Sequence, residues 1–404
     1  MPETTPGAGD PAPDADADAG AEQDADGVAI DRSGARAAAD DQRRRKMIAI
    51  GAAAVVALLA IGGLVFALTR SEDEPAPTTT TTSTTTTEST TTVAPAPPPV
   101  APLTGVAVDP ADPAVMERLQ RPALVAKVDN APQAMPQVGL DRTDVVIELQ
   151  VEGISRYMAV VHSQPVDEIG PIRSARTSDP DLLAMFVRPL VAWSGGNPTV
   201  TNIMNSTPWI QALNPDQAPG AYFRSRDKRA PHNLIARVPE LYARADQPPA
   251  LPVPLFSYLA AGQDPGGAPV AGFDIAVGRS PSSWVWDGGR WLRWANGTRQ
   301  TVAGAGQVGA TNVVVLSTPY VASSADSRSP EARTIGSGAA WVFTQGRMIE
   351  GTWERAEPAQ PWQLKLPGGA PMALTPGNTW VELPSPESGP GLLAPERAQA
   401  LLQG

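Results

Sequence analysis

Arginine side chains are concentrated in two short segments, and both segments are suited to holding an anion. The first is IGPIRSARTSD (169–179), where Arg173 and Arg176 stand just before a predicted helix. A helix N-terminus carries about half a positive charge and unpaired N–H groups, so guanidinium groups beside it would favour a carboxylate or phosphate. We expect the second segment, YFRSRDKRAPHN (222–233), to converge on the same corner. It contributes Arg226, Arg229 and His232.

Three further polar residues complete the predicted ligand-binding set. Asn130 and Asn197 offer neutral hydrogen bonds, and Arg156 lies just after a turn that begins at Glu152. A second interpretation stays open, in which the arginines only pair with nearby acids and bind no ligand. The acids close to them in the sequence are Asp179, Asp181 and Asp227.

Catalysis is an alternative to binding. Glu148 and Glu152 could form the carboxylate pair of a glycosidase, and His232 could act as a general acid or base. The S-x-x-K pattern at 225–228 lacks the S-D-N and K-T-G elements that accompany it in penicillin-binding enzymes. Because no nucleophile is identified, we expect a binding protein rather than an enzyme.

The composition excludes several kinds of site. Cysteine is absent and the histidines are His162 and His232, so we expect neither a metal nor a thiolate nucleophile. GAGQVG (304–309) fits the dinucleotide-binding glycine pattern, but a strand-like segment follows it where a helix is required. We therefore expect no cofactor. The formal net charge is −11, without the basic excess typical of nucleic-acid binding.

The N-terminal quarter of the chain predicts a tether. Residues 1–46 are rich in Ala, Asp, Gly and Pro and are expected to be a disordered tail. An uncharged apolar run at 47–69 would span roughly 34 Å as a helix, enough to cross a membrane. It is longer than the apolar region of a signal peptide and has no A-x-A cleavage site. Basic residues precede it and acidic residues follow it, which predicts a single-pass protein with a cytoplasmic N-terminus.

A stalk and two folded regions follow the apolar run. Residues 70–102 are Thr-rich and then Pro-rich, which is typical of a semi-rigid extracytoplasmic spacer. Segments 122–129, 144–151 and 156–163 predict three strands, so the fold class is α+β. A helix is predicted from Ser178 towards Gly195, and another over 233–246. These elements belong to a mixed N-terminal domain, 103–250.

The sequence pattern changes near residue 270. Hairpin signals at 287–289 and 296–297 lie between aromatic segments, which predicts a mostly antiparallel β domain at 270–384 followed by a tail, 385–404. The tryptophans of this region could stack on sugars, but their alternate spacing favours packing of one hairpin face against its neighbour. They are Trp284, Trp286, Trp291 and Trp294.

Several blocks resemble a known family. PLTG (102–105), the segment 121–163, IGPIRSAR (169–176), RDKRAPHNL (226–234) and the C-terminal blocks 343–353 and 374–383 are similar to the YerB-like family of bacterial envelope lipoproteins. This resemblance implies a two-domain extracytoplasmic protein with no established reaction. The lipidated cysteine of those relatives is absent here, and Asp129–Asn130 stands where an Asn–Asn pair is usual.

Together these observations predict a cell-envelope protein that is anchored by one membrane helix and has its C-terminal domains outside the membrane. We expect it to act as a binding or scaffolding module for an anionic envelope ligand. Its partner would be a cell-wall polymer or an envelope protein. The alternative is a hydrolase or transferase that acts on a wall glycan or polymer with a Glu/His acid-base pair.

Overall fold

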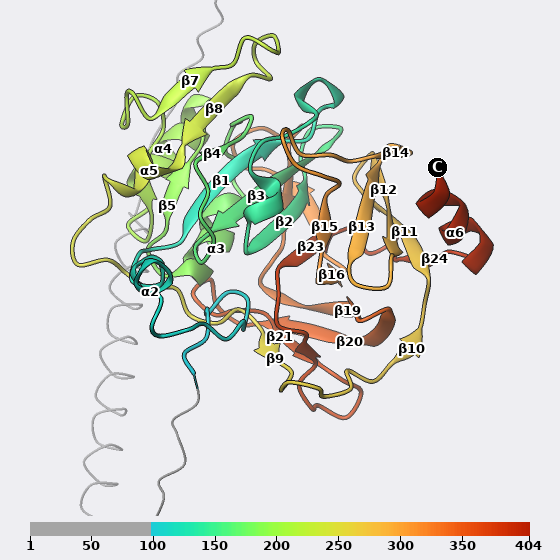
Figure 1. Ribbon diagram of the computed structural model, residues 1–404. Helices are drawn as coiled ribbons and strands as arrows, with labels where there is room; N and C mark the ends of the chain where they lie inside the picture. The colour runs from blue at the N-terminus through green and yellow to red at the C-terminus, as the bar shows by residue number, and fades with distance from the viewer. Residues whose placement is uncertain (1–97) are drawn as a thin grey trace, which may run out of the picture. The chain divides into compact units, whose positions relative to one another are not determined.

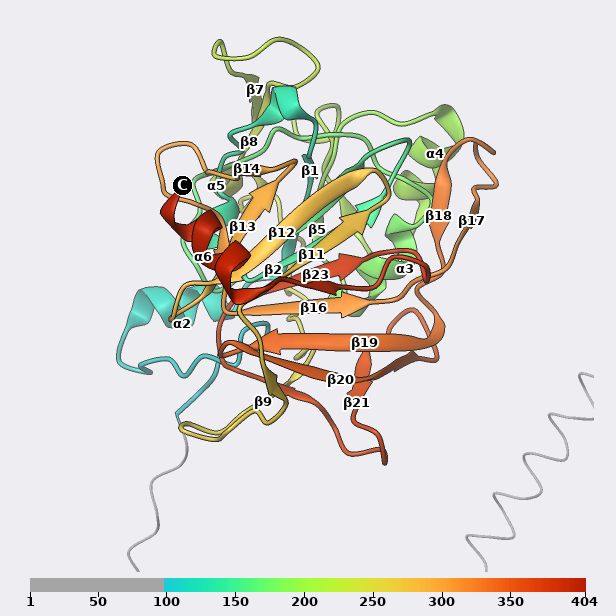
Figure 2. The same cartoon turned by 90° about the vertical axis from the view of Figure 1, so that its right-hand side faces the viewer.

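One large mixed sheet organises residues 98–404, the part of the chain that the computed structural model describes (Figures 1 and 2). The predicted tail (1–46), the membrane helix (47–69) and the stalk up to residue 97 lie outside the described residues. Within 98–404 no helix combines the length and the apolar character needed to cross a bilayer.

The main sheet has 11 strands, with those of the C-terminal half on one side and those of the N-terminal half on the other, joined where β23 lies beside β2. In spatial order they are β10 (Ala268–Pro269), β20 (Arg347–Arg355), β19 (Gly336–Thr344), β16 (Asn312–Leu316), β23 (Thr379–Leu383), β2 (Val145–Gln150), β3 (Ser155–Val161), β1 (Leu124–Asp129), β5 (Leu190–Ala192) and β6 (Gln211–Ala212), with β21 (Gln363–Lys365) beside β20.

Strands β1, β2 and β3 confirm the strand predictions for 122–129, 144–151 and 156–163. β2 and β3 form an antiparallel hairpin whose turn includes Gly153, at φ 71°. β1 pairs antiparallel with β3, so that Asp129 stands opposite Arg156. Because side chains alternate across a strand, this register puts the two charged groups on the same face of the sheet.

Helices cover that face. Residues of α3 (Asp179–Leu183), the 3₁₀ turn η3 (Ala184–Phe186) and α4 (Pro198–Ser206) share one hydrophobic core with β2 and β3. The helix predicted from Ser178 is shorter than expected, because Val187 adopts a φ of 60° and the chain then enters β5. Ser178 makes no capping bond to α3; its hydroxyl accepts a hydrogen bond from the Ala332 N–H instead.

A second, antiparallel sheet packs against the other face, and its strands lie beside β2 and β3 in Figure 1. Its turn at Asn296–Gly297 has positive φ at both residues, as a two-residue hairpin turn requires. The predicted antiparallel character of this region is confirmed. The strands are β11 (Gly272–Val277), β12 (Ser280–Trp286), β13 (Trp291–Ala295), β14 (Thr298–Arg299), β15 (Gly309–Ala310) and β24 (Gly391–Leu392).

Smaller elements surround these layers. The predicted helix 233–246 is wrong in its first part, because residues 234–237 form a strand that pairs with two others. The remaining elements are α2 (Pro113–Leu119), η1 (Pro132–Ala134), η2 (Leu140–Arg142), β4 (Glu168–Ile169), β7 (Tyr222–Arg224), β8 (Leu234–Arg237), α5 (Val238–Tyr242), β9 (Ser257–Tyr258), β17 (Tyr320–Ala322), β18 (Pro330–Ala332), β22 (Ala373–Leu374) and α6 (Pro395–Gln403).

Strand β23 joins the two halves of the sequence. It lies between β2 and β16 and runs parallel to both. Its register with β2 places Glu382 directly beside Glu148. The α+β class is therefore confirmed, and the segments 103–250 and 270–384 contribute neighbouring strands to one sheet.

Candidate anion-binding site

Arg156 is the central group of the site. Its residue is only 5% exposed, on the helix-covered face of β3. Nη1 donates a hydrogen bond to the Ser174 carbonyl at 3.3 Å, whereas Nε has no hydrogen-bond partner among residues 98–404. No carboxylate of the described chain lies within ion-pair distance of this guanidinium. Burial, followed by the nearby charges of Arg176 and Arg173, lowers the pKa of Arg156 to about 10.

The two predicted basic segments meet at a buried acid, Asp129. Its Oδ2 lies 3.2 Å from Nε of Arg173 and 2.7 Å from Nδ1 of His232. Its Oδ1 accepts a hydrogen bond from the Ala131 N–H at 3.1 Å. Asp129 therefore fixes Arg173 and His232, and the charge of Arg173 is compensated within the protein.

Arg176 has a different partner. Nη2 forms an ion pair of 2.5 Å with Glu152, whose other oxygen accepts a hydrogen bond from the Ser329 hydroxyl. Burial opposes the ionisation of Glu152, but these two hydrogen bonds outweigh it and lower its pKa to about 2. The backbone N–H of Arg176 donates to Asp179, which also holds the buried Lys127 at 2.9 Å.

A polar hollow of about 250 Å³ opens beside Arg176. Asn197 caps α4 from its rim by accepting a hydrogen bond from Val200 N–H, and its amide donates to the Ala325 carbonyl. The loop between β17 and β18 closes the hollow from the other half of the sequence. The lining residues are Glu152, Ser174, Arg176, Thr177, Gly196, Asn197, Val200, Ser323, Asp326 and Ser329.

This arrangement can hold a small anion that has further polar groups. Arg156 does not line the hollow, but it donates a hydrogen bond to the carbonyl of Ser174, which does, and its charge interacts with those of Arg176 and Glu152, which also line it. A guanidinium with unused N–H donors in a buried setting is a strong partner for a carboxylate or phosphate. The surrounding hydroxyl and amide groups could receive the ligand's own hydroxyl groups.

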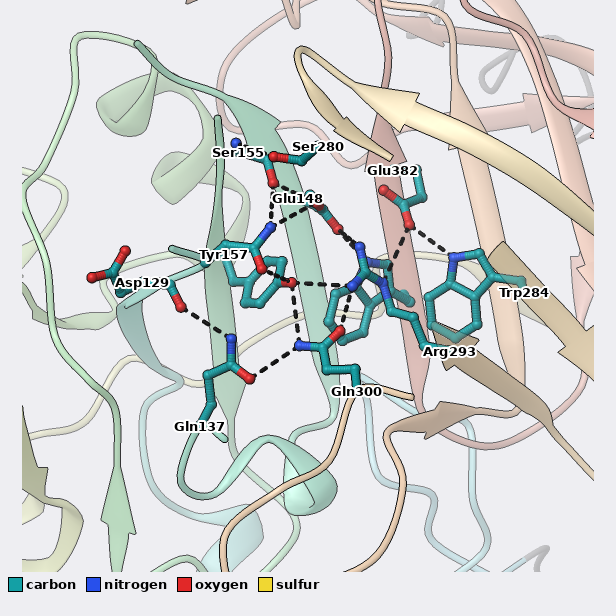
Figure 3. A network of polar contacts seen from close by, with 12 residues as sticks. Asp129, Gln137, Glu148, Ser155, Tyr157, Ser280, Trp284, Arg293, Gln300 and Glu382 are labelled. Carbon is teal, nitrogen blue, oxygen red and sulfur yellow. Dashed lines mark hydrogen bonds and ion pairs between the residues drawn. The ribbon is translucent and has the colours of Figure 1, made fainter. Parts of the chain in front are cut away.

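Other predicted site residues lie in the interior, within a polar network between the two sheets (Figure 3). Asn130 is buried, donates hydrogen bonds to Glu148 and Ser155, and accepts one from the Tyr157 hydroxyl. Glu148 is fully buried and forms a 2.7 Å ion pair with Arg293. Glu148 has no partner in common with Glu152, so these glutamates do not form the predicted carboxylate pair.

The network also holds a second carboxylate, Glu382. It accepts a hydrogen bond from the Trp284 indole at 2.9 Å, and Arg293 lies 3.9 Å away (Figure 3). Burial, together with the neighbouring Glu148 carboxylate, raises the pKa of Glu382 well above its ordinary value. Glu382 therefore holds its proton more tightly than an exposed glutamate. Trp284 and Trp291 are buried on one face of the hairpin, as predicted, whereas Trp294 packs on the opposite face with Val285 and Ala398 of α6.

The residues of the predicted basic segment 222–233 do not all reach the same place. His232 reaches Asp129, but Arg226 and Arg229 are exposed in the β7–β8 loop and do not line the hollow. Conversely, the sequence did not identify Asp129, Ser174 and the loop residues Ser323 and Ser329. No local pattern marks these residues, because they reach the site through strand register and a distant hairpin.

Comparisons with known proteins agree with this organisation. The family described as "Protein of unknown function (DUF3048) N-terminal domain" matches residues 103–250, and the corresponding C-terminal domain matches residues 273–381. The Bacillus subtilis protein named "Putative lipoprotein YerB" is 47% identical over 77 residues, which span 19% of this chain and 22% of that relative.

A solved structure shows the same fold. The crystal structure of the YerB protein from Bacillus subtilis superposes with a TM-score of 0.62 at 20% sequence identity. The alignment covers 72% of this chain and 99% of that one.

Proposed function

The chain belongs to the two-domain YerB-like family, and from this premise we propose that it is an envelope protein that binds a small anionic ligand at the hollow beside Arg156. The family description assigns no function, so the proposal depends on the site. The ligand class is a carboxylate or phosphate that also has hydroxyl groups.

The proposal depends on one observation: carboxylates do not balance all of the positive charges of the three clustered arginines. Arg173 is met by Asp129 and Arg176 by Glu152, but Arg156 has no carboxylate partner in the described part of the chain. A buried, uncompensated charge is costly unless something neutralises it. A bound anion would supply the missing negative charge and use the free Nε donor.

The proposed location of the protein in the envelope depends on two segments of the sequence. The apolar run at 47–69 would anchor the chain, and the stalk at 70–102 would hold the folded region at a distance from the bilayer. The Bacillus subtilis relative is named a lipoprotein, which places an anchored protein in the same family. The ligand would then be an envelope polymer, a glycan or a group on an envelope protein.

The binding test uses the full-length protein in detergent. Glucuronate and inorganic phosphate serve as probes, and calorimetry measures their Kd in low salt. Arg156→Gln should weaken binding of the preferred probe at least about tenfold, because a charge-assisted hydrogen bond is lost. Arg333→Gln removes an exposed arginine elsewhere and should leave the Kd unchanged.

Arg176→Gln provides a second variant if the Arg156 substitution prevents folding. Wild-type protein that binds neither probe at millimolar concentration would contradict the proposal. A Kd that both arginine substitutions leave unchanged would contradict it as well.

The Asp129–His232 pair supports a second candidate, a hydrolase or transferase that acts on a wall polymer. A buried carboxylate at 2.7 Å orients the imidazole, as acid-base catalysis requires. Glu148 is enclosed, so Glu152 and His232 are the remaining candidates. Product formation from wall fragments that His232→Gln abolishes, without a change in fragment binding, would favour this candidate; no products from the wild type would exclude it.

A further inference from the structure

The β7–β8 hairpin carries a second concentration of positive charge, separate from the hollow. Its residues Arg224, Arg226, Lys228 and Arg229 face one nearby acid, Asp227, whose carboxylate accepts a hydrogen bond from Ser225. Neither Arg226 nor Arg229 forms an ion pair with any residue between 98 and 404. Both arginines are exposed, so their charges are available to a partner.

Hydrogen bonds from neighbouring residues fix the conformation of the loop. Asn233 donates hydrogen bonds to the carbonyls of Ser225 and Lys228, at 2.9 and 3.1 Å, and accepts one from Arg224 at 2.9 Å. Lys228 donates to the Pro136 carbonyl, and the adjacent His232 is fixed to Asp129. The backbone that displays the arginines is therefore organised before any partner arrives, which reduces the entropy cost of binding.

In Figures 1 and 2 the β7–β8 hairpin projects at the top of the described part of the chain. Its loop is therefore accessible to a partner as large as a polymer.

The chemistry of the loop selects the type of partner. Residues 224–231 (RSRDKRAP) include no aromatic or large aliphatic side chain, so the loop has nothing to insert into a bilayer or to stack on bases. Several separate cations suit a partner with repeated anions, because each weak contact adds to the others and releases counterions. Arginine also binds phosphate oxygens through two N–H groups at once.

We propose that this hairpin is a docking surface for a linear polymer with repeated phosphate groups. It uses residues that do not line the hollow, so it can operate whether or not the hollow binds a small anion.

The test measures binding of linear inorganic polyphosphate to the full-length protein in detergent over a series of NaCl concentrations. The double variant Arg226→Ala/Arg229→Ala should bind about tenfold more weakly at low salt. Its plot of log affinity against log salt should be shallower by roughly 1.4 to 1.8, the contribution of two phosphate contacts. The control, Arg142→Ala/Arg397→Ala, has the same net charge and removes exposed arginines elsewhere; it should bind like the wild type.

Three results would overturn the proposal. The first is an unchanged affinity in the hairpin variant, and the second is an equal loss in the control, which would show an effect of net charge alone. The third is hairpin-dependent binding to phosphatidylglycerol vesicles with none to polyphosphate, since a lipid surface would then be the partner. Weaker hairpin-dependent binding to polyglutamate than to polyphosphate would support the preference for phosphate.

Discussion

Compensation of charge differs among the three clustered arginines, of which Arg176 lines the hollow. Arg173 and Arg176 each meet a carboxylate, and Arg156 is left with one carbonyl acceptor. Burial, and then repulsion from Arg176 and Arg173, lowers the pKa of Arg156. A ligand anion would therefore compete with Glu152 for Arg176 while it satisfies Arg156.

This competition predicts the effect of Glu152→Gln. The substitution keeps the shape of the side chain and removes the negative charge that holds Arg176, so affinity for the anionic probe should rise several-fold. The measurement is the Kd of that probe at neutral pH. Glu331→Gln removes an acid from another ion pair and is the matched control. A weaker affinity in Glu152→Gln would show that Glu152 positions Arg176 and does not compete with the ligand.

The buried pair of carboxylates predicts a pH-dependent stability. Because its pKa is raised, Glu382 holds its proton to a higher pH in the folded protein than in the unfolded chain, where it ionises above about pH 4.3. Its contribution to stability is thus present at low pH and is lost as the pH rises. Glu382→Gln mimics the neutral acid, so the free energy of unfolding of this variant should improve relative to wild type from about pH 5 upward. Denaturant unfolding at several pH values measures the difference.

Glu148→Gln is the comparison for this experiment. It removes the charge that balances the buried Arg293 and should destabilise the protein by about 3 kcal/mol or more at neutral pH. If Glu382→Gln and Glu148→Gln lost equal amounts of unfolding free energy, Glu382, too, would be ionised in the folded protein.

The sequence could predict which charged residues lie near the site, but not which ion pairs they form. Asp179 and Asp227 were the acids nearest to the arginines in the sequence. In the structure Asp179 binds Lys127, and the partners of Arg173 and Arg176 are Asp129 and Glu152. Such pairs depend on strand register and on which groups are buried, and neither is encoded in local spacing.

At the level of elements, strands β1 to β3 could be predicted because their apolar residues form short runs bounded by turns. The helix after Ser178 could not be bounded correctly, since nothing in the sequence shows that Val187 adopts a positive φ. The sequence did not predict that the loop between β17 and β18 belongs to the site, because the loop is far from the other site residues in the sequence. The Thr177–Ser323 hydrogen bond, for example, joins residues 146 positions apart.

The Lys127–Asp179 ion pair connects β1 to α3, and both side chains are fully buried. Burial lowers the pKa of Lys127, and the Asp179 carboxylate opposes that shift. Asp179→Ala should destabilise the protein by about 3–5 kcal/mol because the lysine charge loses its partner. The double variant Lys127→Met/Asp179→Leu should recover most of that loss, as measured by urea unfolding. A double variant no more stable than Asp179→Ala would show that the carboxylate acts mainly through its bond to the Arg176 N–H.

For the whole molecule, the sequence predicted two consecutive domains, and the family matches follow the same division. What it could not show is that β23 inserts between β2 and β16, because strand order in a sheet depends on contacts between distant segments. Each half therefore leaves an unpaired strand edge and part of its core exposed when the other is absent.

The pairing of β2 with β23 predicts that residues 98–250 do not fold cooperatively alone. Without β23, strand β2 loses its parallel partner, and Trp380 no longer covers Tyr157. Circular dichroism and thermal unfolding of the fragment should show no cooperative transition. Addition of a fragment of residues 251–404 should restore one. A sharp transition in the isolated N-terminal fragment would show that its core is sufficient.

Insertion of β23 also constrains the order of events during biosynthesis. The Trp380–Glu148 hydrogen bond joins residues 232 positions apart, so the centre of the sheet cannot close until nearly the whole polypeptide has emerged. Until then the early strands keep an open edge, and a chain that stops before residue 379 lacks the strand that closes the sheet.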